Sequence, residues 1–132
     1  MIRSRAKSRT VTLFTLFAAT LTAMGLQAGE RSLPDPLAAG WNGAPVCEKL
    51  HEDPDQRILR CTFEPGQGHE RHYHERHFGY ALSGGRMRIK DARGEREVDL
   101  ATGSHFSSDG VDWHEVLNVG DTTVVYLVVE PR

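Results

Sequence analysis

Histidine is the residue type best placed to do chemistry in this chain of 132 residues. Three of the seven histidines, His72, His74 and His77, fall within six residues, and His114 follows much further along. Imidazole is the commonest protein ligand for a transition metal. The cluster therefore predicts a site for one divalent transition metal, with Fe, Mn, Zn, Ni and Cu as candidates.

The spacing of these histidines suits a β-strand better than a helix. Alternate residues of a strand point to the same face, so His72 and His74 can aim at one point. His77 cannot share that face on an unbroken strand, but a bend at Glu75-Arg76 would return it from the next strand. His114 would arrive as a fourth ligand from a later strand. Four neutral imidazoles can leave coordination positions open for water or substrate.

The remainder of the chain reads as short strands between turn residues, which is typical of an all-β sandwich or barrel. No convincing helical stripe follows the N-terminal region. The last predicted strand is apolar on both faces, as a central buried strand should be. The predicted strands are Val46–His51, Arg57–Phe63, Glu70–His74, His77–Leu82, Arg86–Lys90, Glu95–Leu100, Ser104–Ser107, Trp113–Asn118 and Thr122–Glu130.

The first 28 residues resemble a secretory signal peptide, with a basic start, an apolar run and small residues near Ala28. Cleavage after Gly25 is the rival position, and a retained membrane anchor is the alternative. Removal changes the formal charge from −2 to −6, because this segment carries four positive charges and no negative one. We therefore expect an exported protein, periplasmic or secreted, that binds neither nucleic acid nor, after signal removal, membrane.

The two cysteines, Cys47 and Cys61, belong to strands that flank a turn around Pro54. They are equidistant from Pro54, so antiparallel pairing about this turn would place them opposite each other. Export would allow the resulting disulfide to persist. Two reduced core cysteines are the equal alternative, and a zinc site is poorly supported because no Cys-x-x-Cys pair accompanies them.

Two glycine- and histidine-containing motifs resemble those of a small single-domain cupin. Gly66 precedes His72-Tyr73-His74 by the spacing of the first cupin motif, which ends on a glycine. Counting back from Gly84 puts the motif's glutamate position on His77, whereas counting back from Gly85 puts it on Phe78. The second motif keeps its spacing at Gly103, His114 and Asn118, but Asp109 and Val111 replace its proline and glycine.

The cupin resemblance implies a double-stranded β-helix, the jelly-roll barrel, over residues 46–132, preceded by an extended arm over residues 29–45. It also implies that the metal ligands are His72, His74, His77 and His114. We prefer the count that selects His77, because phenylalanine cannot bind a metal. The alternative is a degraded site whose histidines are satisfied by hydrogen bonds.

Cupins with histidine-rich sites include dioxygenases, isomerases and lyases, so the resemblance implies either an enzyme for a small organic molecule or a non-catalytic binding module. A homodimer is a further implication. Tyr80 and Glu115 are candidate general bases. Arg86 and Arg88 could bind a substrate carboxylate in forked geometry, although a solvated outer face explains their alternation better.

Overall fold

The nine predicted strands are all present in the computed structural model, which describes residues 33–132. Their ends differ from the predicted ends by two residues at most, and the predicted signal peptide lies outside the described residues. The strands are β3 (Cys47–Glu52), β4 (Gln56–Phe63), β5 (Gly68–His74), β6 (His77–Ser83), β7 (Gly85–Asp91), β8 (Gly94–Leu100), β9 (His105–Ser108), β10 (Val111–Asn118) and β11 (Val124–Pro131).

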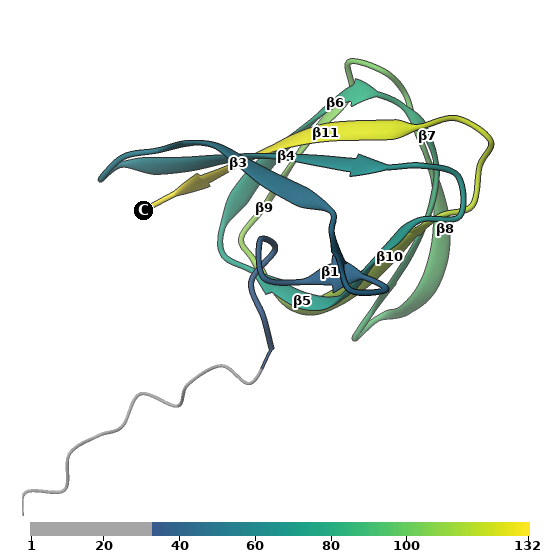
Figure 1. Cartoon of the computed structure of the whole chain (residues 1–132), viewed down its shortest axis with the longest axis horizontal. Coiled ribbons are helices and arrows are strands. Elements are labelled where there is room, and N and C mark those ends of the chain that lie inside the picture. Colours follow the sequence, from purple (N-terminus) through teal and green to yellow (C-terminus); the bar gives the residue numbers. More distant parts are fainter. Residues whose placement is uncertain (1–32) are drawn as a thin grey trace, which may run out of the picture. The chain divides into compact units, whose positions relative to one another are not determined.

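Two antiparallel sheets form the walls of a barrel (Figure 1). One has the strand order β3-β4-β11-β6-β9, and the other has the order β5-β10-β7-β8. Several neighbours in the sheets are far apart in the sequence, as when β11 lies between β4 and β6. This is the double-stranded β-helix, so the predicted all-β jelly-roll class is confirmed. No helix among residues 33–132 is long and apolar enough to cross a membrane.

The core lies between the two sheets and follows the period of two expected for strands with one buried face. Every second residue of β4 is buried, including Leu59, Cys61 and Phe63. The apolar C-terminal strand β11 contributes Val124 and Val128 to the same cluster. Because β11 is the middle strand of the five-stranded sheet, its near-continuous apolar sequence is explained by its position.

The N-terminal arm contains a short hairpin, which its prediction as an extended segment did not include. Its strands are β1 (Gly40–Trp41) and β2 (Ala44–Pro45). Asn42 and Gly43 form the turn with positive φ angles of 52° and 80°. The arm is hydrogen-bonded to β5, because the backbone N–H of Tyr73 donates to the carbonyl of Pro34 at 3.2 Å.

Cys47 and Cys61 lie opposite each other in the β3–β4 pair, so the predicted register is confirmed. The two residues form a disulfide, and both are buried in the core cluster. The bond ties β3, an edge strand, to β4.

Reduction of this disulfide is expected to lower the free energy of unfolding by about 3 kcal/mol, because a loop of about 15 residues is then no longer closed in the unfolded chain. Urea denaturation of the oxidised and the reduced protein would measure the difference. A Cys47→Ala/Cys61→Ala variant should be insensitive to the reductant. Identical urea midpoints for oxidised and reduced wild-type protein would contradict the expectation.

Candidate metal centre

Three of the four predicted ligands converge inside the barrel. The potential ligand atoms of His72, His74 and His114 all lie within 4.8 Å of one another. The Nε2 atom of His72 is 3.1 Å from that of His74 and 2.9 Å from that of His114. His72 and His74 share a face of β5, and His114 is the direct cross-strand neighbour of His72 on β10. Strand alternation and register therefore bring the three imidazoles together.

The hydrogen bonds of the other ring nitrogens decide where the protons are. His72 Nδ1 is 2.6 Å from the backbone carbonyl of Glu70, which can only accept, so Nδ1 is the donor. His74 Nδ1 is 3.2 Å from Oε1 of Glu130, a carboxylate that forms an ion pair with Arg57. In a neutral imidazole one nitrogen donates and the other carries the lone pair. His72 and His74 therefore turn two Nε2 lone pairs toward each other.

Facing lone pairs at this distance repel unless a proton or a cation lies between them. His72 and His74 have no ring proton left for the shared space in their neutral forms. Burial is the main reason that the pKa of His72 falls to about 4, and it also lowers the pKa values of His74 and His114. The rings are therefore neutral at neutral pH. A divalent metal that prefers imidazole nitrogen fits this donor set.

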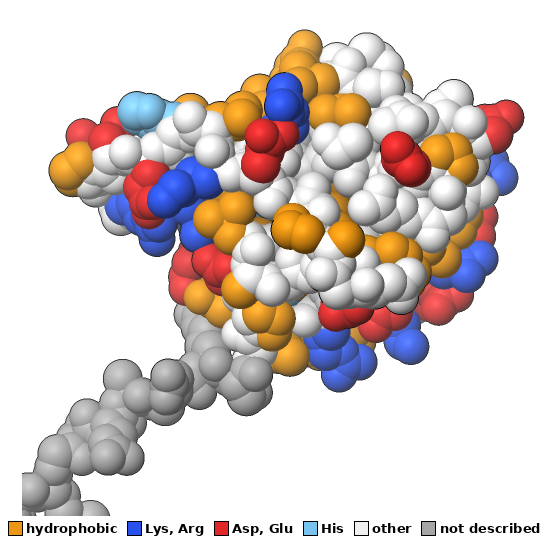
Figure 2. All heavy atoms as spheres, in the orientation of Figure 1, with side chains coloured by type: hydrophobic (Ala, Val, Ile, Leu, Met, Phe, Trp, Pro, Cys, Tyr) orange, Lys and Arg blue, Asp and Glu red, His pale blue; other side chains and the backbone are white. Residues whose placement is uncertain are grey.

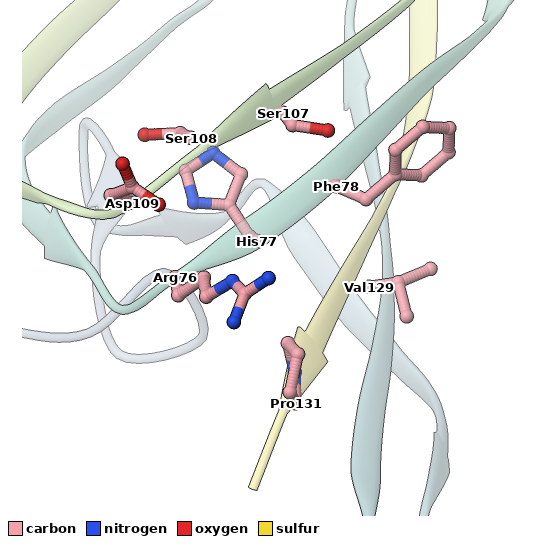
Figure 3. Close-up of a pocket in the computed structure, with 8 residues that line it drawn as sticks. All are labelled: Arg76, His77, Phe78, Ser107, Ser108, Asp109, Val129 and Pro131. Atoms are coloured by element: carbon pink, nitrogen blue, oxygen red, sulfur yellow. The ribbon is translucent and has the colours of Figure 1, made fainter.

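His77 lies beside this group of three and outside it. It opens β6 directly after the predicted bend, and its ring centroid is 4.5 Å from that of His74. Its Nδ1 donates to the carbonyl of Glu75 at 2.8 Å, which leaves Nε2 with the lone pair. Figure 3 shows the ring between β6 and the side chains of Ser108 and Asp109. The assignment of His77 as a ligand stays a prediction.

A buried ion-pair chain supports His74, and sequence reasoning missed it entirely. Glu130 of β11 accepts from His74 through one oxygen and from Arg57 Nε through the other, at 2.7 Å. Arg57 also donates to Asp35 of the N-terminal arm, at 2.7 Å. Glu130 is 2% exposed and Arg57 is 7% exposed, so both charges depend on each other. Carboxylates behind a ligating histidine commonly fix its tautomer and ring orientation.

The charged groups of this ion-pair chain stabilise one another. Burial opposes the charged form of Arg57, but hydrogen bonds to Asp35 and Glu130 raise its pKa above the ordinary value. Burial likewise opposes ionisation of Asp35, yet the hydrogen bond from Arg57 keeps the pKa of this carboxyl below its usual range. Asp35 and Arg57 therefore both remain charged at neutral pH. The residues of this ion-pair chain are far apart in the sequence, from Asp35 to Glu130, so no local pattern links them.

His69, which is not among the predicted ligands, is also buried. It is 1% exposed, and its ring lies against that of His72 with centroids 3.8 Å apart. Its Nε2 atom is 3.3 Å from the carbonyl of Ala39 in the arm. Histidine is nearly absent from the molecular face in Figure 2, as expected when four of these residues are buried.

A cavity of about 410 Å³ adjoins the histidines, which is within the usual size range of small-molecule pockets. His77 and His114 lie in its wall, and most of the other lining residues are apolar. Phe106 also lines it, and this ring lies 2.3 Å from the position that a Cβ atom on Gly79 would take. Gly79 therefore makes room for a bulky neighbour. Tyr126 also lines the cavity, and burial raises its pKa, so its hydroxyl stays protonated.

The other predicted candidates lie elsewhere. Tyr80 is exposed on the outer face of β6, and Glu115 follows His114 on β10 opposite Lys90, so neither lines the cavity. Arg86 and Arg88 lie on the outer face of β7, where they form ion pairs with Asp99, Glu95 and Glu97 of β8. This charged ladder is the solvated outer face that their alternation favoured. Charges of both signs are intermixed along that edge of the barrel in Figure 2.

Comparison with known proteins assigns the barrel to one family. A family model described as a cupin domain matches residues 59–130. A cupin domain from Bordetella pertussis Tohama I is similar in structure, with a TM-score of 0.63 and 18% identity over 76% of this chain and 98% of that chain. A double-stranded β-helix protein from Klebsiella pneumoniae gives a TM-score of 0.54 and 20% identity over 67% of this chain and 72% of that one.

The polyketide cyclase RemF from Streptomyces resistomycificus gives a TM-score of 0.53 and 22% identity over 64% of this chain and 63% of that one. No curated protein matches the sequence. At these identities the structural neighbours show the fold alone, and the chemistry has to be argued from the site.

Proposed function

This chain belongs to the cupin family, and we propose that it is a metal-dependent enzyme acting on a small organic molecule, of dioxygenase, isomerase or lyase type. The observation that carries the proposal is the convergence of three imidazole Nε2 atoms beside a cavity that could admit a substrate. A single divalent transition metal would satisfy those atoms. The small molecule is the partner that the cavity size suggests.

The residues that would hold the metal are His72, His74 and His114, with His77 as the fourth ligand. When bound, the metal would supply Lewis-acid or redox activation. The chain's own residues would do the rest. Glu130 and the Glu70 carbonyl hold the Nδ1 protons and so keep both Nε2 lone pairs aimed at one point. Apolar side chains such as Met87, Ile89 and Val116 would exclude bulk water around the reacting group.

A non-catalytic metal- or ligand-binding module is the second candidate. Among the described residues that line the cavity, histidine and tyrosine are the only side chains free to act as an acid or base. The one carboxylate of the wall, Asp91, is ion-paired with Arg93 and Arg96. The two candidates differ in the coordination sphere. An enzyme site keeps a position for exchangeable water or substrate, whereas a closed four-ligand site serves structure.

The test is a titration of the metal-free protein with Mn²⁺, followed by water-proton relaxation. We expect one equivalent to bind and the bound ion to enhance relaxation, because water exchanges at an open position. Binding without enhancement would favour the module. Less than about half an equivalent of any first-row metal on folded protein would overturn metal binding altogether.

His77→Ala is expected to weaken Co²⁺ binding by about tenfold while His72, His74 and His114 retain the ion. His77→Glu is the matched variant, because it places a carboxylate where the cupin motif has one, and it should restore most of the affinity. Competition with a chromophoric chelator would measure both variants. Unchanged affinity in His77→Ala would remove this residue from the site and leave a three-histidine centre.

We also propose that the protein works outside the cytoplasm. The basic and apolar N-terminal sequence and a cysteine pair suited to an oxidising compartment support this. Analysis of the N-terminus of protein recovered from its host would test it, since a start after Ala28 or Gly25 is expected. The homodimer implied by the family resemblance stays a prediction.

A further inference from the structure

One arginine faces the inside of the barrel, and the metal site does not use it. On β8 the residues Arg96, Val98 and Leu100 are half-buried and line the cavity, whereas the alternate residues are exposed. Arg96 lies beside the cavity residue Ile89 in the β7–β8 register. Its side chain is therefore next to apolar residues of the cavity wall, while 39% of it stays accessible to solvent or to a ligand.

Its protein partner is already shared. Arg96 Nη1 lies 2.9 Å from Oδ2 of Asp91, and Arg93 Nη2 lies 3.0 Å from the same oxygen. Among the residues of the described chain that line the cavity, Asp91, Arg93 and Arg96 are the only aspartate, glutamate, lysine or arginine side chains. Two guanidinium groups and one carboxylate leave one positive charge uncompensated there. Among the described residues, Arg96 has no other ion-pair partner.

The outer arginines of the same sheet behave differently. Arg88 contacts both Glu95 and Glu97, and Arg86 contacts Asp99, so the outer face of β7 and β8 has acidic partners for its arginines. The excess positive charge is therefore confined to the inner face, at the end of the sheet that also carries His114. Sequence reasoning looked for carboxylate recognition at Arg86 and Arg88, which lie on the wrong face.

We infer that the cavity takes a small organic anion with an apolar body, whose anionic group is bound by Arg96 with the help of Arg93. The apolar body would contact the wall formed by Met87, Ile89, Val98 and Leu100, next to His114. Arginine matches a carboxylate with two parallel N–H donors, which gives orientation as well as attraction. This inference rests on the proposed function for its substrate class, but the binding itself does not need the metal.

The test uses benzoate and benzyl alcohol, two probes of similar size that differ in charge, titrated into metal-free and metal-loaded protein by calorimetry. Benzoate is expected to bind at least about tenfold more tightly than benzyl alcohol in both forms, as a charge-assisted hydrogen bond predicts. Arg96→Met should lose about tenfold in benzoate affinity and leave benzyl alcohol unchanged.

Arg88→Met is the matched control. Arg88 and Arg96 have similarly exposed side chains, 40% and 39%, and the two variants change net charge equally. Arg88→Met should keep the wild-type preference for benzoate. Equal losses in the two variants, or no preference in wild-type protein, would overturn the inference. If Arg96→Met does not fold, Arg96→Lys should keep the preference while binding benzoate more weakly than wild type, and unchanged benzoate affinity would overturn it.

The outcomes separate this inference from the metal proposal. Benzoate binding that appears only with metal and ignores Arg96→Met would assign the anion to the ion, which overturns the inference and leaves the proposed function intact. If the protein binds no metal but still prefers benzoate over benzyl alcohol in a way that depends on Arg96, the anion site is supported and the proposed enzyme function fails.

Discussion

His114→Ala is expected to lower the affinity for Co²⁺ or Zn²⁺ by at least about a hundredfold, more than the loss typical of a supporting residue. The variant removes one of three converging imidazoles and leaves two neutral donors from a single strand. His51→Ala is the control, because His51 is exposed on the β3–β4 hairpin and should not affect metal affinity. Wild-type affinity in His114→Ala would place the metal site elsewhere.

The stability of the two proteins should depend on metal in opposite ways. A ligand that binds only the folded state stabilises it by about 2.7 kcal/mol at a hundred times its dissociation constant. Wild-type protein should therefore gain thermal stability when metal is added, whereas His114→Ala should not. Without metal the variant should lose only the contact between the Nε2 atoms of His114 and His72, which are 2.9 Å apart.

Glu130→Ala is expected to destabilise the metal-free protein by about 3–5 kcal/mol, because removing one partner of a buried ion pair leaves the other charge uncompensated. Arg57 would keep only Asp35, and His74 would lose the acceptor of its Nδ1 proton. Urea denaturation in the presence of a chelator would measure the loss. Glu130→Gln keeps the shape and is the variant to use if Glu130→Ala does not fold.

Glu130→Gln should also weaken metal binding, by about 10–100-fold, because the carboxylate orients a ligating histidine. Glu48→Gln is the matched control, since Glu48 forms an ion pair with Arg60, another arginine of β4, but at the surface. Exposed pairs of this kind contribute about 0–1 kcal/mol, so this variant should keep its stability and its metal affinity. Similar losses in the two variants would show that Glu130 has no special role at the site.

Local patterns were sufficient wherever the physics was local. Alternation of buried residues located the strands, and equal distances from Pro54 located the Cys47–Cys61 register. The same alternation put His72 and His74 on one face, and the bend before His77 is where β6 begins. None of these inferences needed contacts between distant segments. The place of His114 beside them did, and there the resemblance to a known motif supported the residue type and spacing.

Long-range pairing decided the features that pattern analysis missed. Glu130 is separated from Arg57 by 73 residues and from His74 by 56, and no local period links them. Arg96 differs from Arg86 and Arg88 in the face of the sheet that it occupies. Because charged residues alternate along both neighbouring strands, the sequence does not indicate which face points into the barrel. Tyr80 and Glu115 do not line the cavity, and their role as general bases stays a prediction.

By itself, the sequence determined an all-β barrel with a histidine cluster, because strand period, turn residues and ligand spacing are encoded within a few residues of each other. The tertiary structure decided which imidazoles converge, which buried carboxylate fixes His74, and which arginine faces the cavity. Those outcomes depend on closing two sheets over one core, where a charge or lone pair acquires its partner only from a strand distant in the chain.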